Sequence, residues 1–137
     1  MVAYRRVYGL NVEVKAVAAR GDHVVEFARR HQIPTAYRSF RELIADREID
    51  AIYNPLPNHL HLPWSIKAAE AGKHVLCEKP IGLSVAEAKK LRDARDRTGV
   101  KIGEAFLVRT HPQWLKVLDL VRAGRVGEPR SMMGFFS

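Results

Sequence analysis

Short apolar runs alternate along the chain with longer runs in which apolar residues recur every three or four positions. The short runs are typical of strands and the longer runs of amphipathic helices. We therefore predict strands over residues 12–18, 49–53, 73–77, 100–106 and 129–136. Helices are predicted over residues 22–31, 39–44, 60–71, 84–98 and 112–121.

Local signals support several of the predicted helix ends. Ser39 is followed three positions later by Glu42, and Ser84 by Glu87, which is the spacing of a capping box. Asp22 can cap the first helix. Pro63 would fall in the first turn of the helix over residues 60–71, where proline is tolerated.

Strands separated by helices indicate βαβ units and a parallel sheet. The predicted fold class is α/β, a Rossmann-like sheet with helices on both faces. The alternation ends near residues 104–109, which is the one plausible domain boundary. Ligands of such sheets lie at the carboxyl ends of the strands, and polar residues gather in three of the segments that follow predicted strands: 54–61, 78–80 and 107–112.

Composition narrows the function classes. The 137 residues suffice for one domain, or one domain plus a piece of another, and carry a net charge of +8. The basic residues are dispersed among acids, with no block of five or more and no nucleic-acid-binding motif, so a basic solvated surface is favoured over nucleic-acid binding. No apolar run reaches the roughly 18 residues of a spanning helix. The N-terminus does not resemble a signal peptide, and a single cysteine fits a reducing, cytoplasmic setting.

Two motifs at fixed spacing carry a family resemblance. Residues 53–61 read Tyr-Asn-Pro-Leu-Pro-Asn-His-Leu-His, and residues 68–80 read Ala-Ala-Glu-Ala-Gly-Lys-His-Val-Leu-Cys-Glu-Lys-Pro. Together they resemble the glucose–fructose oxidoreductase and inositol dehydrogenase family, called Gfo/Idh/MocA. Residues 103–106, Arg109 and residues 111–113 extend the match toward the dihydrodiol and sugar dehydrogenases of that family. The resemblance covers residues 12–137.

The resemblance implies an NAD(P)-dependent oxidoreductase that transfers hydride between a sugar, polyol or diol hydroxyl and the nicotinamide. Residues 1–106 would belong to the Rossmann domain, and residues 107–137 would begin an α+β second domain. Lys79 matches the catalytic lysine of the family. The matching cofactor-binding positions are Glu78 at the ribose, Pro57, Asn58 and His61 along the cofactor, and Arg109 near the nicotinamide.

Arg20 bears on the choice of cofactor. In the family an acid after the second strand accepts the ribose hydroxyls of NAD, whereas this chain has Ala19 and Arg20 there. An arginine can pair with a 2′-phosphate, so NADP is favoured over NAD.

The family's first strand and its Gly-x-Gly-x-x-Gly turn have no counterpart here, and the chain stops where the second domain begins. We therefore expect a fragment with reduced or no activity, lacking its first βα unit, and either forming a homo-oligomer or pairing with an intact homologue. The alternative is a non-catalytic remnant that binds nucleotide or a homologous subunit.

Structural explanations stand beside each functional one. Lys79 and Arg109 could be ordinary surface cations, Glu78 a solvated acid and His61 a helix cap. The scattered histidines and one cysteine fit no zinc pattern, so no metal site is predicted. Cys77 follows Val75 and Leu76 in a predicted strand, where a thiol is buried and inert.

Overall fold

The computed structural model describes residues 12–134. The chain divides between Glu104 and Ala105 into two compact units. No helix of the described residues is long and apolar enough to cross a membrane.

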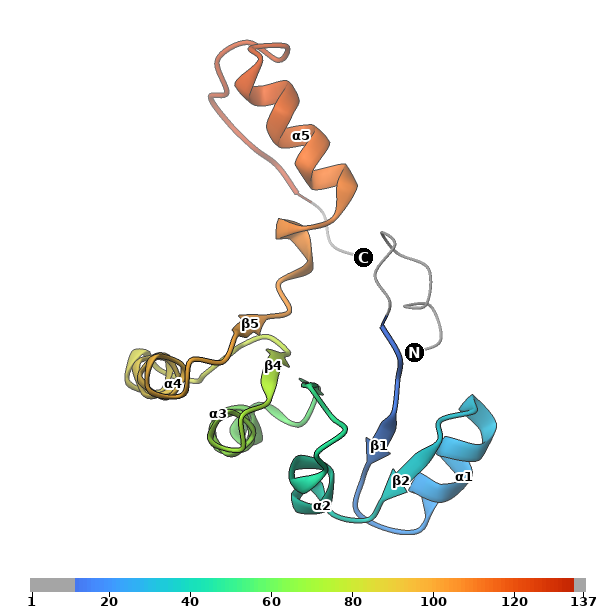
Figure 1. Ribbon diagram of the computed structural model, residues 1–137. Coiled ribbons are helices and arrows are strands. Elements are labelled where there is room, and N and C mark those ends of the chain that lie inside the picture. The colour runs from blue at the N-terminus through green and yellow to red at the C-terminus, as the bar shows by residue number, and fades with distance from the viewer. Residues whose placement is uncertain (1–11, 135–137) are drawn as a thin grey trace. The chain divides into compact units, whose positions relative to one another are not determined.

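All the strands within residues 12–134 belong to the first unit, and all pair in parallel (Figure 1). Strand β1 (Ala16–Ala18) pairs with β2 (Thr35–Tyr37). A second sheet has the order β3-β4-β5, formed by Ala51–Asn54, His74–Cys77 and Ile102–Glu104. The predicted parallel α/β fold is therefore confirmed.

Helices connect these strands. They are α1 (His23–His31), α2 (Phe40–Ala45), α3 (Asn58–Glu70) and α4 (Val85–Thr98). Helix α1 contacts β1 and β2, while α3 contacts β3, β4 and α4. The second unit contains a short 3-10 helix, η2 (Leu107–Arg109), and α5 (Pro112–Arg122).

The core of the second sheet is built from small and medium-sized side chains. Ala68 of α3 lies against Val75 and Cys77 of β4, and all three are buried. Four isoleucines from surrounding elements cover this cluster: Ile44, Ile52, Ile81 and Ile102. The predicted burial of Cys77 is confirmed, and desolvation raises the pKa of its thiol, which keeps the thiol protonated.

The sequence analysis missed one strand, and one of its strand predictions was wrong. Strand β2 was not predicted, because three residues after Pro34 are too few to show an alternating pattern and only pairing with β1 defines the strand. Conversely, residues 129–134 are exposed and form no strand, and they take part in neither of the described sheets. Residues 135–136 lie outside the described range.

Two details of the predicted helix starts were also wrong. Helix α3 begins at Asn58, immediately after Pro57, so Pro63 lies inside the helix and leaves the His59 carbonyl without its usual N–H donor. Asp22 stands at the start of α1, but its side chain makes no capping bond. Its Oδ1 instead accepts a hydrogen bond from Nε of Arg38 at 2.7 Å.

The capping residues predicted from the sequence agree best with the structure at helix α4. Ser84 Oγ accepts a hydrogen bond from the Glu87 N–H at 3.2 Å, and Gly99 ends the helix with a φ of 72°. The Glu87 carboxylate accepts from the Leu83 N–H, one residue before the cap. The Ser39 hydroxyl accepts a hydrogen bond from the Arg41 N–H rather than from the Glu42 N–H. Of the capping box predicted at the start of α2, only the bond to the serine hydroxyl therefore forms.

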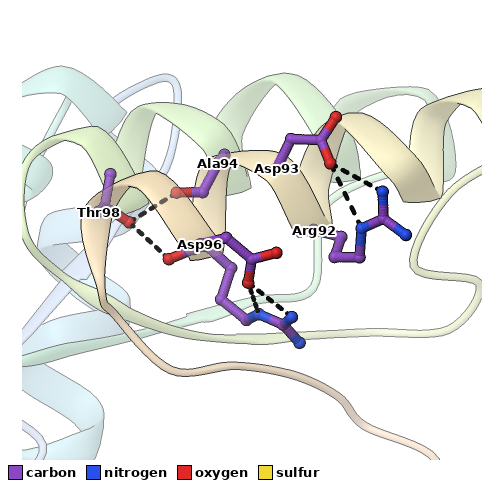
Figure 2. A network of polar contacts seen from close by, with 6 residues as sticks. Arg92, Asp93, Ala94, Asp96 and Thr98 are labelled. Carbon is purple, nitrogen blue, oxygen red and sulfur yellow. Dashed lines mark hydrogen bonds and ion pairs between the residues drawn. The ribbon is translucent and has the colours of Figure 1, made fainter.

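Figure 2 shows the polar side of α4, where each of two arginines pairs with the aspartate that follows it. The distance from Nη2 to Oδ1 is 3.0 Å between Arg92 and Asp93 and 2.7 Å between Arg95 and Asp96. These pairs are exposed, so each contributes little to stability.

The serine cap of α4 gives a test of local stability. Replacing Ser84 by Ala leaves the Glu87 N–H without its acceptor, and we expect the free energy of unfolding to fall by about 1 kcal/mol. Urea denaturation measures the change. Ser84→Thr retains the hydroxyl and serves as the control, and equal stability of the Ala and Thr variants would contradict the cap assignment.

Candidate functional site

The candidate site lies at the carboxyl edge of the β3-β4-β5 sheet. The parallel register places Asn54 opposite Cys77, and Cys77 opposite Glu104. The last residues of the three strands are therefore neighbours, and the segments that follow them leave from one edge (Figure 1).

Asn54 shapes the turn from β3 into α3. Its side chain is buried, and Nδ2 donates to the His61 carbonyl at 3.1 Å and to Ser65 Oγ at 3.0 Å. Its Oδ1 accepts a hydrogen bond from the Leu56 N–H. This arrangement leaves Pro57 and Asn58 exposed at the start of α3.

Glu78 follows β4 and is held by two donors. The Tyr53 hydroxyl donates to Oε1 at 2.7 Å, and the Lys79 N–H donates to Oε2 at 3.1 Å. The Tyr53 bond, followed by the Lys79 N–H, lowers the pKa of the Glu78 carboxyl, because both bonds favour the charged form. Glu78 is therefore a fixed carboxylate at neutral pH, accessible at the sheet edge.

The segment that carries Lys79 is fixed to both neighbouring strands. The Glu78 N–H donates to the Asn54 carbonyl at 3.0 Å, and the Ile81 N–H donates to Glu104 Oε1 at 2.8 Å. The peptide bond between Lys79 and Pro80 is cis. The Lys79 side chain is exposed, and no hydrogen bond or ion pair joins its ammonium to another described residue.

His61 differs from the other candidate residues because its side chain is only 1% exposed. Its Nδ1 lies 2.7 Å from the Pro80 carbonyl, and its Nε2 lies 2.6 Å from the Leu56 carbonyl. The ring therefore lies behind the two loops that leave β3 and β4.

Arg20 lies at a different edge, beyond the end of β1, and is exposed. The Ala19 N–H bonds the Tyr37 carbonyl, which continues the pairing of β1 with β2 and brings Arg38 to the same edge. Arg38 is held there by its ion pair with Asp22.

The structure thus brings Glu78, Lys79 and His61 together and adds two residues that the sequence analysis did not propose, Tyr53 and Asn54. Both were within the quoted motif, and their position at the end of a strand was the available signal. Arg109 is exposed in η2 of the second unit. No group of three metal-binding side chains gathers anywhere in the described part of the chain.

The hydrogen bond from Tyr53 to Glu78 predicts how the Glu78 carboxyl titrates. In Tyr53→Phe the carboxylate loses its first donor, so we expect the pKa of Glu78 to rise toward its ordinary value, as measured by carbon NMR of the carboxyl group. Because the wild-type pKa is lowered, the bond is present above that pKa and is lost as the pH falls through it.

Tyr37→Phe is the matched control. The Tyr37 hydroxyl donates to the Asp46 carboxylate at 3.0 Å, away from Glu78. This variant should change the titration of Asp46 and leave that of Glu78 as it was. A Glu78 titration identical in Tyr53→Phe and wild type would show that the bond does not form in solution.

Comparison with known proteins gives a consistent set of relatives. An uncharacterised oxidoreductase of Rhizobium meliloti is 52% identical over 127 residues, which is 92% of this chain and 38% of that protein. An NADP(+)-dependent D-xylose 1-dehydrogenase of Haloferax volcanii is 41% identical over 91% of this chain and 38% of its own length. A solved 3-ketoreductase from Actinomadura kijaniata, in complex with TDP-benzene and NADP, has a TM-score of 0.79 and 35% identity over 86% of this chain and 36% of its own.

The chain thus spans less than two-fifths of the length of these relatives. Residues 4–106 match the model of the GFO_IDH_MocA group, described as an oxidoreductase family with an NAD-binding Rossmann fold. The resemblance inferred from the two motifs is confirmed, and the chain belongs to the Gfo/Idh/MocA family of oxidoreductases.

Proposed function

We propose that this chain supplies the catalytic lysine and part of the cofactor site of an NAD(P)-dependent dehydrogenase acting on a sugar, polyol or diol hydroxyl. The observation that carries the proposal is the loop at residues 78–81. It presents an accessible lysine ammonium and an ionised carboxylate from a backbone anchored to the strands on either side.

Glu78 suits the ribose of the cofactor. A fixed carboxylate accepts hydrogen bonds from neighbouring hydroxyls, and Tyr53 with the Lys79 N–H orients it in advance. Pro57 and Asn58 are exposed at the end of the neighbouring strand, so the cofactor can lie along them.

Lys79 is the proposed proton carrier. When bound, the nicotinamide supplies the hydride chemistry. A lysine amine at the substrate hydroxyl can take up its proton as the alcohol is oxidised and return it in the reverse direction. Because the Lys79 backbone is anchored through Glu78 and Ile81, the reach of the amine is limited to one edge of the sheet.

Arg20 favours NADP over NAD. It is an exposed cation at the end of β1, which corresponds to the family's second strand, after which Rossmann folds bind the 2′ position of the adenosine ribose. Two of the relatives support this choice, because one is named as NADP(+)-dependent and the other is solved with NADP.

The remaining assignments follow from the same family membership. Residues 1–106 are proposed as part of the cofactor domain and residues 107–137 as the beginning of the substrate domain, from which Arg109 would approach the nicotinamide. His61 is proposed to serve the cofactor site indirectly, because its ring is buried. The protein is proposed to act in the cytoplasm, as a homo-oligomer or paired with a homologous subunit.

Cofactor preference is tested by titrating the purified chain with NADPH and with NADH and monitoring the nicotinamide fluorescence. Loss of a charged contact to the 2′-phosphate should weaken NADPH binding by about tenfold in Arg20→Ala and leave NADH binding unchanged. Arg30→Ala removes the same charge at the other end of α1 and should bind both cofactors like wild type. A folded chain that binds neither cofactor would instead favour the non-catalytic alternative.

The role of Lys79 is tested by hydride transfer to NADP from a panel of sugars, polyols and diols. In Lys79→Ala the rate should fall by roughly a hundredfold or more, because the proton acceptor is lost, while NADPH binding is largely retained. Lys90→Ala, an exposed lysine of α4, is the control and should keep the wild-type rate. Where the wild-type chain oxidises a member of the panel, equal rates in the two variants would exclude Lys79 as the proton carrier. The wild-type rate also measures the reduced activity that is expected of the chain alone.

A further inference from the structure

The His61 ring joins the two loops of the candidate site from within the protein. Its Nε2 lies 2.6 Å from the carbonyl of Leu56, in the loop that follows β3. Its Nδ1 lies 2.7 Å from the carbonyl of Pro80, which directly follows Lys79. At 1% exposure the ring has little access to water, so these two oxygens are its polar partners in the described structure.

The chemistry of these partners determines how many protons the ring carries when both contacts are hydrogen bonds. A carbonyl oxygen only accepts. A neutral imidazole has one donor nitrogen and one acceptor nitrogen, so it can bond one carbonyl and turns a lone pair toward the other. The imidazolium has two N–H donors and bonds both. Both carbonyls therefore receive a hydrogen bond only when the ring carries two protons.

The surroundings of the ring support a positive charge. A buried cation is tolerated only where hydrogen-bond acceptors and an opposite charge compensate for its lost hydration. The two carbonyls are the acceptors, and the Glu78 carboxylate is close enough to be affected by charge on the ring. Other titratable groups lie on the strands of this edge and on the segment that follows β4: Tyr53 on β3, Cys77 at the end of β4, Lys79 after it and Glu104 at the end of β5. His59 lies on the same helix as His61.

We infer that His61 is a positioning residue which, as an imidazolium, clamps the loop carrying Lys79 to the loop that follows β3. When the ring has two protons, both carbonyls are bonded and the two loops are held together. When it loses one proton, one of the two bonds is lost and the loops separate more easily. The position of Lys79 then depends on the protonation of a buried ring that does not itself reach the substrate.

The consequence for catalysis rests on the proposed function, because it matters only if Lys79 carries the substrate proton. The clamp itself is a property of this chain without any cofactor. The two can therefore fail separately, and the test is made on the full chain with no cofactor added.

The experiment is a pH titration of the nitrogen-15-labelled chain by NMR. At the acidic end of the range in which the fold persists, both ring nitrogens of His61 should show directly bonded protons. As the ring loses a proton, the backbone amide signals of Lys79 and Ile81 should shift with the same midpoint as the ring. That shared midpoint is the signature of positioning, because a ring with a purely structural role would not move the loop.

Three variants serve as controls. In His61→Gln the shared transition of the Lys79 and Ile81 amides should disappear. In His59→Gln, which alters an exposed histidine of the same helix, it should remain. In Glu78→Gln it should also remain, which excludes the nearby carboxyl as its source.

The inference is overturned if the His61 ring keeps a single proton throughout the range in which the fold persists. It is equally overturned if the loop amides do not follow the ring, or if their transition survives in His61→Gln. Should His61→Gln fail to fold, the wild-type titration still decides between these outcomes.

Discussion

The parallel register of β3, β4 and β5 is the constraint on which the candidate site depends. It places Asn54, Cys77 and Glu104 side by side, so the polar residues that follow each strand meet at one edge. The loop after β4 can then be bonded to β3 through the Glu78 N–H and to β5 through the Ile81 N–H. A slip of one residue would turn every side chain of the slipped strand to the other face and separate these partners.

The features that could be predicted from the sequence are those that local patterns determine, namely the strands, the helices and their ends. Apolar periodicity located four of the five strands that the structure describes. Ser84, Glu87 and Gly99 marked the ends of α4, because capping is a short-range interaction. The contacts that build the site are long-range. The Tyr53–Glu78 bond spans 25 positions, the His61–Pro80 contact spans 19 and the Arg38–Asp22 bond spans 16. Such contacts exist only once strands have paired, so the motif identified Glu78 and Lys79 but could not reveal what holds them.

Buried and exposed polar groups have different roles in this chain. Among the described residues, every buried side-chain nitrogen and oxygen has a hydrogen-bond partner. Asn54, His61 and Ser65 form one such buried group beneath the loops of the site, where leaving a polar atom unpaired would be costly. The arginine–aspartate pairs on α4 are exposed and can be exchanged for other polar residues at small cost. The geometry beneath the loops therefore comes from a few buried polar side chains, whereas the surface arginine–aspartate pairs contribute little to it.

The position of Cys77 gives the molecule an internal reporter of local opening. It is the only cysteine in the chain, it is fully buried, and it directly precedes the Glu78-Lys79-Pro80 loop. An alkylating reagent can reach its thiol only when the end of β4 separates from its neighbours. With opening and closing fast, the alkylation rate reports the free energy of that local opening rather than of global unfolding. The mobility of the loop that carries Lys79 can thus be followed at a single natural atom, without introducing a label.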